Sequence, residues 1–139
     1  MPLVQLIYVS SAKQELTEAE LDAILESSVR GNTPLQVTGL LLYSHGSFMQ
    51  VLEGESAAVD EVYRRICDDP RHHHLIEILR EEIGEREFGR WAMGFRRLRR
   101  EDAGRHEAFL PLYIKGFDAE ALQAKPGNAL ELLHHFALR

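Results

Sequence analysis

The chain has 139 residues, the length of one domain, and its 45% hydrophobic and 27% charged residues are typical of a globular protein with a buried core. With 16 basic against 22 acidic residues the net charge is −6, which argues against nucleic acid or an anionic membrane as a partner, because both attract basic surfaces. The sequence shows neither an export signal nor an apolar run near the roughly 20 residues of a membrane span, so we expect a cytoplasmic protein.

The N-terminal segment predicts a strand followed by a helix. Residues 3–9 are rich in β-forming residues, and the alternation of a strand would place Val4, Leu6 and Tyr8 on one face. A capping box at 17–20 begins the helix, and Gly-Asn shortly before a proline ends it near residue 32. The inward faces are expected to carry Val4, Leu6 and Tyr8 on the strand, and Leu21, Ile24, Leu25 and Ser28 on the helix.

A hairpin and a second helix come next. Residues 36–43 and 47–53 predict two strands joined by a short loop that contains glycine. The helix predicted from 54 to about 69 ends at Asp-Asp-Pro. It contains the single cysteine, Cys67, which we expect to be a buried thiol rather than a nucleophile. The apolar stripe of this helix consists of Val59, Val62, Tyr63 and Ile66.

The remaining elements complete a recognisable order. A fourth strand is predicted over 74–83 and a fifth over 91–98, and two helices are predicted over 119–125 and 129–138, separated by Pro-Gly-Asn. The order strand, helix, strand, strand, helix, strand is typical of the ferredoxin-like βαββαβ arrangement. We therefore expect an α+β fold in which two helices cover one face of an antiparallel sheet.

The C-terminal segment has no assigned place in that arrangement. We treat residues 1–98 as the core and 99–139 as a C-terminal helical appendage. The appendage either covers the second face of the sheet or forms a self-association surface. We also expect a homo-oligomer, with the C-terminal helices or an exposed sheet face as the contact. Its apolar residues are Phe109, Leu110, Leu112, Leu130, Leu132, Leu133 and Phe136.

Two polar side chains fall among apolar neighbours on the predicted strands, the Tyr8 phenol and the Gln50 carboxamide. Because an unpaired buried polar group costs roughly 1–3 kcal/mol, Gln50 indicates either a local hydrogen bond or a bound ligand. Taken singly, each candidate has a structural explanation. Tyr8, Trp91 and Met93 can be core residues, and Asn32 can form a helix C-terminal turn.

Two further clusters invite functional interpretations that we do not favour. Three consecutive histidines at 72–74 would point to alternate faces of an extended chain, and no cysteine or paired carboxylate completes a ligand set. We therefore expect a solvated cluster and no metal site. The basic run at 96–100 is short and is followed by two acidic residues, so we expect it to be solvated or paired within the molecule.

Considered together, these residues resemble the BLUF domain, the flavin-binding module of blue-light sensors. The resemblance spans about residues 3–98 and depends on an ordered set of motifs rather than on any one of them. The set consists of Tyr8, Asn32, Thr38-Gly39-Leu40-Leu41-Leu42-Tyr43, Gln50-Val51-Leu52-Glu53-Gly54, Asp69-Pro70-Arg71-His72 and Trp91-Ala92-Met93-Gly94-Phe95.

The resemblance implies a non-covalent flavin, usually FAD, between the two core helices. Tyr8 and Gln50 match the photoactive pair, and Trp91 and Met93 would lie beside them on the last strand. A flavin ring is apolar on its faces and polar along one edge, so it needs aliphatic walls and a carboxamide such as Asn32. The other implied cofactor-binding residues are Ile24 and Ile66 on the ring faces, Arg65 near the carbonyl edge, and Ser28, Arg71 and His72.

The resemblance also implies a mechanism. Light makes the flavin a strong oxidant, Tyr8 releases an electron and a proton, and the Gln50 amide between them either turns or tautomerises, so that its hydrogen bonds rearrange. Trp91 and Met93 would pass this change into the sheet and the C-terminal helices. The expected function is a blue-light photoreceptor that is not itself an enzyme.

A photoreceptor of this kind signals to a separate effector protein, by analogy a cyclic-di-GMP phosphodiesterase or a response-regulator-like protein. Three alternatives differ from this interpretation. In a ligand-free interaction module, Tyr8 and Gln50 would bond only to each other. A hydrolase of the acylphosphatase kind needs a glycine-rich anion loop after the first strand, which the sequence lacks. A flavin enzyme would need a nicotinamide fingerprint or a second pocket.

Overall fold

A computed structural model describes residues 2–12, 14, 16–90, 92–97 and 117–137. Five strands form one sheet in the order β4-β1-β3-β2-β5. The first four pair antiparallel, and β5 lies parallel to β2 at the edge. This is the predicted ferredoxin-like order with one strand added. The strands are β1 (Leu3–Ser11), β2 (Thr38–Ser44), β3 (Ser47–Glu55), β4 (His73–Ile83) and β5 (Gly94–Arg97).

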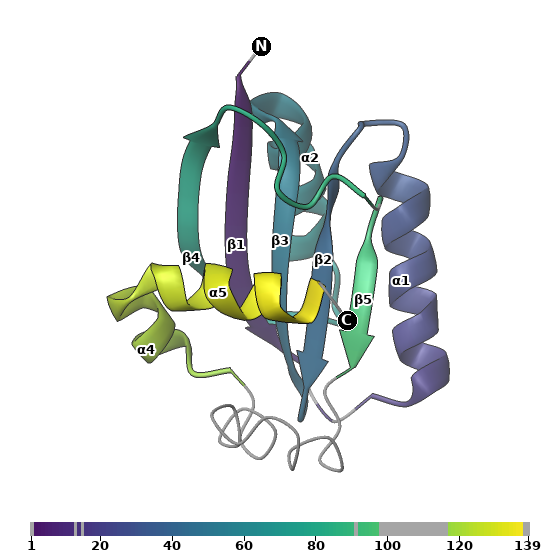
Figure 1. Cartoon of the computed structure of the whole chain (residues 1–139). Helices are drawn as coiled ribbons and strands as arrows, with labels where there is room; N and C mark the ends of the chain where they lie inside the picture. The colour runs from purple at the N-terminus through teal and green to yellow at the C-terminus, as the bar shows by residue number, and fades with distance from the viewer. Residues whose placement is uncertain (1, 13, 15, 91, 98–116, 138–139) are drawn as a thin grey trace.

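Helices cover both faces of this sheet (Figure 1). On one face lie α1 (Glu18–Asn32) and α2 (Ser56–Cys67), the two core helices. On the other lie α4 (Ala119–Ala124) and α5 (Pro126–Ala137), and α5 runs across the strands. No helix in the described part of the chain has both the length and the apolarity to cross a bilayer.

Alternation along the strands divides the core in two. Side chains of even number on β1 and β3, such as Leu6 and Leu52, pack under α1 and α2. Those of odd number, such as Ile7 and Val51, pack under α5 with Leu133 and other helix residues. The predicted inward face of β1 is therefore confirmed. Burying both faces explains why the central strands are nearly continuous runs of buried residues.

The C-terminal helices thus take the first of their two expected roles, because α5 covers the second face of the sheet. Leu133 and Phe136 are buried there, at 0% and 6% exposure. The predicted apolar residues at 109, 110 and 112 lie outside the described residues, and the boundary between 98 and 99 stays a prediction.

Several boundaries and burial predictions are corrected. Strand β2 begins at Thr38 rather than at Gln36, because Gln36 has a φ of 55° and cannot pair in a strand. Helix α5 begins at Pro126 rather than at Ala129, since proline is well suited to a first helical turn, where no backbone N–H is needed. Cys67 is exposed, not buried, because it is the last residue of α2, where the helix ends.

The capping box is present as predicted. Thr17 accepts a hydrogen bond from the backbone N–H of Glu20 at 3.1 Å, and the Glu20 carboxylate accepts one from the backbone N–H of Thr17 at 3.0 Å. The box fixes the first turn of α1, so its apolar face meets the sheet with Leu21 and Ile24.

Candidate functional site

A cavity of about 300 Å³ lies between α1 and α2 above the sheet. This volume is at the lower end of the roughly 300–1,000 Å³ usual for small-molecule sites. Its walls come from α1, α2, β2, β3 and the turn after α2. The eight residues predicted to bind a cofactor all line it: Ile24, Ser28, Asn32, Gln50, Arg65, Ile66, Arg71 and His72.

Aliphatic side chains of the two helices line the cavity from opposite sides. Ile24 of α1 is 2% exposed, and Ile66 of α2 is partly buried. Each belongs to the stripe of its helix that packs toward the sheet, so helical periodicity sets both positions. Arg65, the residue before Ile66 on α2, also lines the cavity and pairs with Glu61 at 3.2 Å, with 52% of its side chain exposed.

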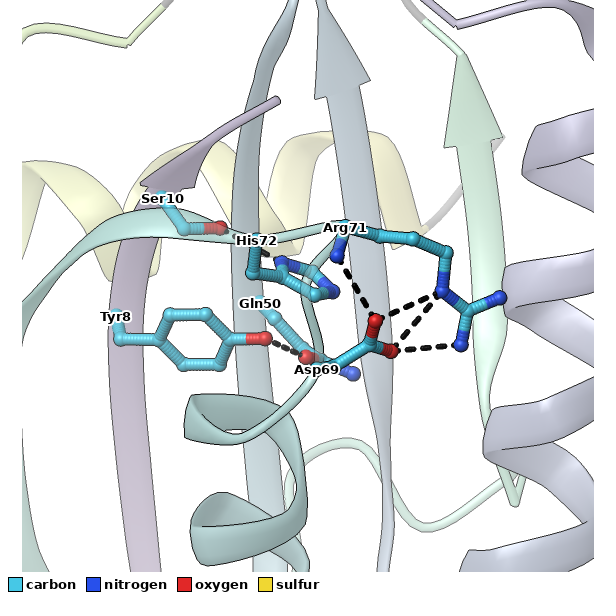
Figure 2. A network of polar contacts seen from close by, with 6 residues as sticks. All are labelled: Tyr8, Ser10, Gln50, Asp69, Arg71 and His72. Atoms are coloured by element: carbon cyan, nitrogen blue, oxygen red, sulfur yellow. Dashed lines mark hydrogen bonds and ion pairs between the residues drawn. The ribbon is translucent and has the colours of Figure 1, made fainter. Parts of the chain in front are cut away.

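At the floor of the cavity, the amide group of Gln50 contacts one residue of β1 and the residue immediately before β5. Tyr8 of β1 donates its hydroxyl hydrogen bond to Gln50 Oε1, and Gln50 Nε2 contacts Met93 Sδ at 3.1 Å (Figure 2 shows the first contact). Tyr8 and Gln50 are directly opposite in the β1–β3 register. All three side chains are buried, at 0%, 2% and 5% exposure.

Asn32 closes one end of the cavity from the last turn of α1. Its Nδ2 donates to the carbonyl oxygen of Ala92 at 3.1 Å, and its own backbone carbonyl accepts from Leu35 and Val37. The side chain is 3% exposed. The expected helix C-terminal turn and the expected cavity contact therefore coexist at this residue, because backbone and side chain serve different partners.

The turn after α2 supplies charged groups at the cavity. The Arg71 guanidinium contacts the Asp69 carboxylate with Nη2 to Oδ2 at 2.6 Å and Nε at 3.0 Å from both oxygens (Figure 2). The backbone N–H of Arg71 also donates to Asp69 Oδ1 at 2.9 Å. Burial alone would raise the pKa of the Asp69 carboxyl, but these hydrogen bonds lower it, so the group stays ionised.

His72 is buried, which corrects the expected solvated cluster. Its Nδ1 lies 2.9 Å from Ser10 Oγ, and its ring lies 4.7 Å from that of Phe48. Burial lowers the pKa of His72 to about 4, with the nearby Arg71 and His73 adding to the effect and Asp69 opposing it. The imidazole is therefore neutral at neutral pH. In the described residues no group of three or more His, Cys, Asp or Glu side chains could hold a metal ion.

The environment of Tyr8 keeps its phenol protonated. Complete burial raises the pKa of Tyr8 well above its usual value, and the nearby Tyr63, Cys67 and Asp69 groups raise it further. The Tyr63 ring lies 5.3 Å from that of Tyr8, with an angle of 58° between the planes. Tyr8 consequently keeps its proton and donates it in a hydrogen bond to Gln50 Oε1 in this structure.

Comparison with known proteins assigns this chain to a family. The profile of the family described as sensors of blue-light using FAD matches residues 3–94. The chain belongs to the BLUF family. It is similar to the blue light- and temperature-regulated antirepressor BluF of Escherichia coli, with 32% identity over 87% of this chain and 31% of that protein. It also resembles photoactivated adenylate cyclase subunit beta of Euglena longa, with 37% identity over 62% of this chain and 10% of that protein.

Solved BLUF structures agree with the fold. The dark-state structure of BlrB, a BLUF protein, has a TM-score of 0.71 and 31% identity, covering 94% of this chain and 97% of that one. A bacterial light-regulated adenylyl cyclase has a TM-score of 0.70 and 30% identity, covering 94% of this chain and 35% of that one. The chain spans about a third of the length of BluF and a tenth of the cyclase subunit.

Some residues in and around the site of this BLUF chain were not predicted from the sequence. Asp69 had no role assigned, although an aspartate two residues before an arginine at a turn is a known local pairing pattern. Ser10 was expected only to end the strand, yet β1 continues through Ser11. Its position two residues after Tyr8 places both on one face, which alternation could have indicated. Trp91, expected beside Gln50, lies outside the described residues.

Proposed function

We propose that this BLUF chain binds FAD in the cavity between α1 and α2 and reports blue light through the hydrogen bonds of Gln50. The observation that carries the proposal is the buried contact series from Tyr8 through Gln50 to Met93, which meets the cavity at Gln50. A buried amide that contacts a ligand site, the neighbouring strand β1 and the residue before β5 can pass a local change into the sheet.

The residues of the cavity fit the ring system of a flavin. Ile24 and Ile66 offer apolar walls for its two faces, and Asn32 and Gln50 offer amide groups for its polar edge. Arg65 and Arg71 add positive charge, which suits electron-rich carbonyl oxygens and the phosphates of a dinucleotide. The cavity volume suits the ring alone, so we infer that the rest of the cofactor extends toward the outside.

Each member of the series has a separate task. When bound, the flavin absorbs blue light and becomes a stronger oxidant. Tyr8 holds a proton on a phenol shielded from water. It would give an electron to the excited flavin and pass that proton along the hydrogen bond to Gln50, and both would return to Tyr8 when the flavin is oxidised again. Gln50 responds because the oxygen and nitrogen of an amide are alike in size and opposite in hydrogen bonding.

Turning the Gln50 amide would reverse both of its contacts. Its Nε2 would face Tyr8, and its Oε1 would face Met93 Sδ, which is an acceptor and donates no hydrogen bond. Met93 would then lose the Gln50 N–H contact that stabilises its position. A tautomeric form of Gln50 would have a similar consequence, because it also changes which atom donates. This is how a change at the cavity reaches β5.

We propose that the chain acts as a sensor and not as an enzyme, and that its output is a changed affinity for a separate effector protein. Related structures include a bacterial light-regulated adenylyl cyclase and a complex of BlrP1 with cyclic diGMP. A cyclic-di-GMP phosphodiesterase and a response-regulator-like protein are our candidate partners. We further propose a homo-oligomer and, given the acidic composition, a cytoplasmic location.

An absorption spectrum of the purified protein before and after blue illumination tests the proposal. A flavin spectrum that shifts to the red in light and returns in the dark supports it, and release of the cofactor by denaturation followed by chromatography distinguishes FAD from FMN. A colourless protein that takes up no added FAD would contradict the proposal and favour a ligand-free interaction module. Light scattering after size exclusion, in dark and light, tests the oligomer.

A further inference from the structure

Glu53 is the one carboxylate among the buried side chains in the part of the chain that the structure describes, with an exposure of 0%. It lies three residues after Gln50 on β3, so the two side chains point to opposite faces of the sheet. Gln50 faces the cavity, and Glu53 faces the side covered by α5. Because burying a charge without partners is strongly unfavourable, a carboxylate at this position requires donors.

Three hydrogen bonds satisfy the Glu53 carboxylate. Gln5 Nε2 donates to Oε2 at 2.8 Å, and the backbone N–H groups of Glu87 and Phe88 donate to Oε2 at 3.1 Å and to Oε1 at 2.6 Å. Gln5 belongs to β1, and the other two donors belong to the loop between β4 and β5. The carboxylate therefore attaches this loop to the sheet.

Arg86 strengthens the attachment from the preceding position. Its Nη1 donates to the Glu53 carbonyl oxygen at 2.9 Å and to Thr38 Oγ1 at 2.8 Å, and its Nη2 donates to the Gln36 carbonyl oxygen at 2.7 Å. Three successive loop residues, 86–88, thus bind the end of β3, and one of them also binds the start of β2. A loop with so many polar attachments has one well-defined position.

The same loop residues hold α5. Glu87 Oε2 accepts from Gln5 Nε2 at 2.9 Å and lies 3.3 Å from His134 Nε2. The Phe88 ring stacks on the His134 ring at 4.8 Å between centroids, with 27° between the planes. Glu87 and Phe88 therefore use their backbones to bind Glu53 and their side chains to bind the helix.

At its other end the loop reaches the cavity. The Ala92 carbonyl accepts from Asn32, and Met93 Sδ contacts Gln50 Nε2. Only four residues separate Phe88 from Met93 in the sequence. A displacement of Met93 would therefore pull on a short segment of the loop. The other end of that segment, at Glu87 and Phe88, is bound to Glu53 and contacts α5.

We propose that Glu53 is a positioning residue that couples α5 to the cavity, by holding the β4–β5 loop in the one position from which Glu87 and Phe88 can retain His134. This inference rests on the proposed function, because it assigns the path by which a change at Gln50 and Met93 alters α5. The Glu53 network (Gln5, Glu53, Glu87, Phe88 and His134) determines how tightly α5 is held, and the cavity modulates the network through Met93.

The competing explanation is that apolar packing alone retains α5. Leu133 and Phe136 are buried in the apolar cluster on this face of the sheet, and that packing would then be sufficient to hold the helix. In that case the Glu53 network would stabilise the fold generally and would have no selective effect on α5. The two explanations differ in where local opening increases when the network is broken.

Amide hydrogen exchange of the full-length chain, followed by mass spectrometry, separates them. Glu53→Gln keeps the size of the side chain but replaces one carboxylate oxygen with an NH₂ group. That group cannot accept the hydrogen bonds that Gln5, Glu87 and Phe88 donate at this position. His134→Ala removes the helix side of the network at a position whose side chain is 47% exposed. Glu131→Ala, at an exposed position of α5, is the matched control.

In the dark, we expect exchange in α5 to rise about five- to thirtyfold in Glu53→Gln and in His134→Ala, with α2 changed much less and Glu131→Ala unchanged. Equal increases in α2 and α5 in both variants, or no increase in α5 in either, would overturn the proposal. Because His134→Ala alters the network only at a partly exposed position of α5, this variant remains informative if Glu53→Gln fails to fold.

Illumination provides the second part of the experiment. We expect blue light to increase α5 exchange in the wild type and to add little in His134→Ala, while the red shift of the flavin stays intact in both. A light-dependent change of α5 that is the same in His134→Ala as in the wild type would contradict the proposal. Absence of any flavin shift in the wild type would refute the proposed function instead, and the dark comparison of variants would still decide the role of Glu53.

Discussion

Gln50 Nε2 lies 3.1 Å from Met93 Sδ, which joins the centre of β3 to the residue immediately before β5. A thioether is a weak acceptor, so this contact is weaker than the hydroxyl hydrogen bond that Tyr8 gives to the same amide. The amide is therefore held firmly at its oxygen and loosely at its nitrogen. Such an asymmetric arrangement allows the Gln50 side chain to exchange partners without breaking the core around it.

Tyr8→Phe is expected to keep the cavity and its flavin but to abolish the red shift, because the ring remains while the proton donor is lost. The variant leaves Gln50 Oε1 without a donor and should lower the free energy of unfolding by about 1–3 kcal/mol. Absorption difference spectra and urea unfolding measure the two effects.

Tyr63→Phe is the matched control for the tyrosine experiment. Its ring lies beside that of Tyr8, and burial raises the pKa of Tyr63 to about 12, but it makes no contact with Gln50 in the described structure. We expect it to retain the red shift. Loss of the shift in Tyr63→Phe, or a normal shift in Tyr8→Phe, would refute the assigned role of Tyr8.

Met93→Leu tests the weak side of the Gln50 amide. Leucine nearly matches the volume of methionine, so the fold should lose less than about 1.5 kcal/mol, while the sulfur acceptor disappears. We expect the flavin to bind and shift, and the rate of dark recovery to change several-fold. Gln50→Ala, in contrast, should bind flavin without shifting. The prediction fails if recovery in Met93→Leu matches the wild type.

Asn32→Ala should weaken flavin binding by about tenfold, which corresponds to about 1.4 kcal/mol, the order of one lost hydrogen bond. It also frees the carbonyl oxygen of Ala92 from its 3.1 Å contact. Fluorescence titration with FAD measures the affinity. Thr33→Ala, at the next and exposed position outside the cavity, serves as the control and should bind as the wild type does.

The neutral state of His72 predicts a pH dependence of stability. Its pKa is lowered to about 4 in the folded chain, whereas an unfolded histidine binds a proton near its ordinary pKa of about 6.5. The unfolded state therefore takes up the proton first, and stability present above pH 6.5 is lost as the pH falls toward 4. The loss from this group is at most about 3 kcal/mol.

Urea unfolding between about pH 7 and pH 4 measures that loss. Carboxylates also titrate in this range, so the comparison is with His72→Gln, which should show a shallower decrease in the free energy of unfolding. His45→Asn, in the exposed β2–β3 turn, is the control and should follow the wild type. Identical slopes for wild type and His72→Gln would show that His72 is not buried in its neutral form.

The local elements followed directly from the sequence, because their signals act over a few residues. Alternation on β1 placed Leu6 and Tyr8 on one face, and the Thr17–Glu20 box set the start of α1. Predictions failed where burial depended on distant segments. Cys67 is exposed, and His72 is buried by Ser10 and Phe48, which lie far from it in the chain.

The sequence alone determined the family, the βαββαβ order and eight of the residues that line the cavity, since these depend on motifs and on the faces of single helices and strands. Only the tertiary structure decided which polar groups meet. Pairing of β1 with β3 in one register brings Tyr8 to Gln50 across 42 positions, and the route of the β4–β5 loop brings Met93 to the same amide. It also made Glu53 a buried acceptor. Register and loop path depend on the packing of both sheet faces at once, which no local pattern contains.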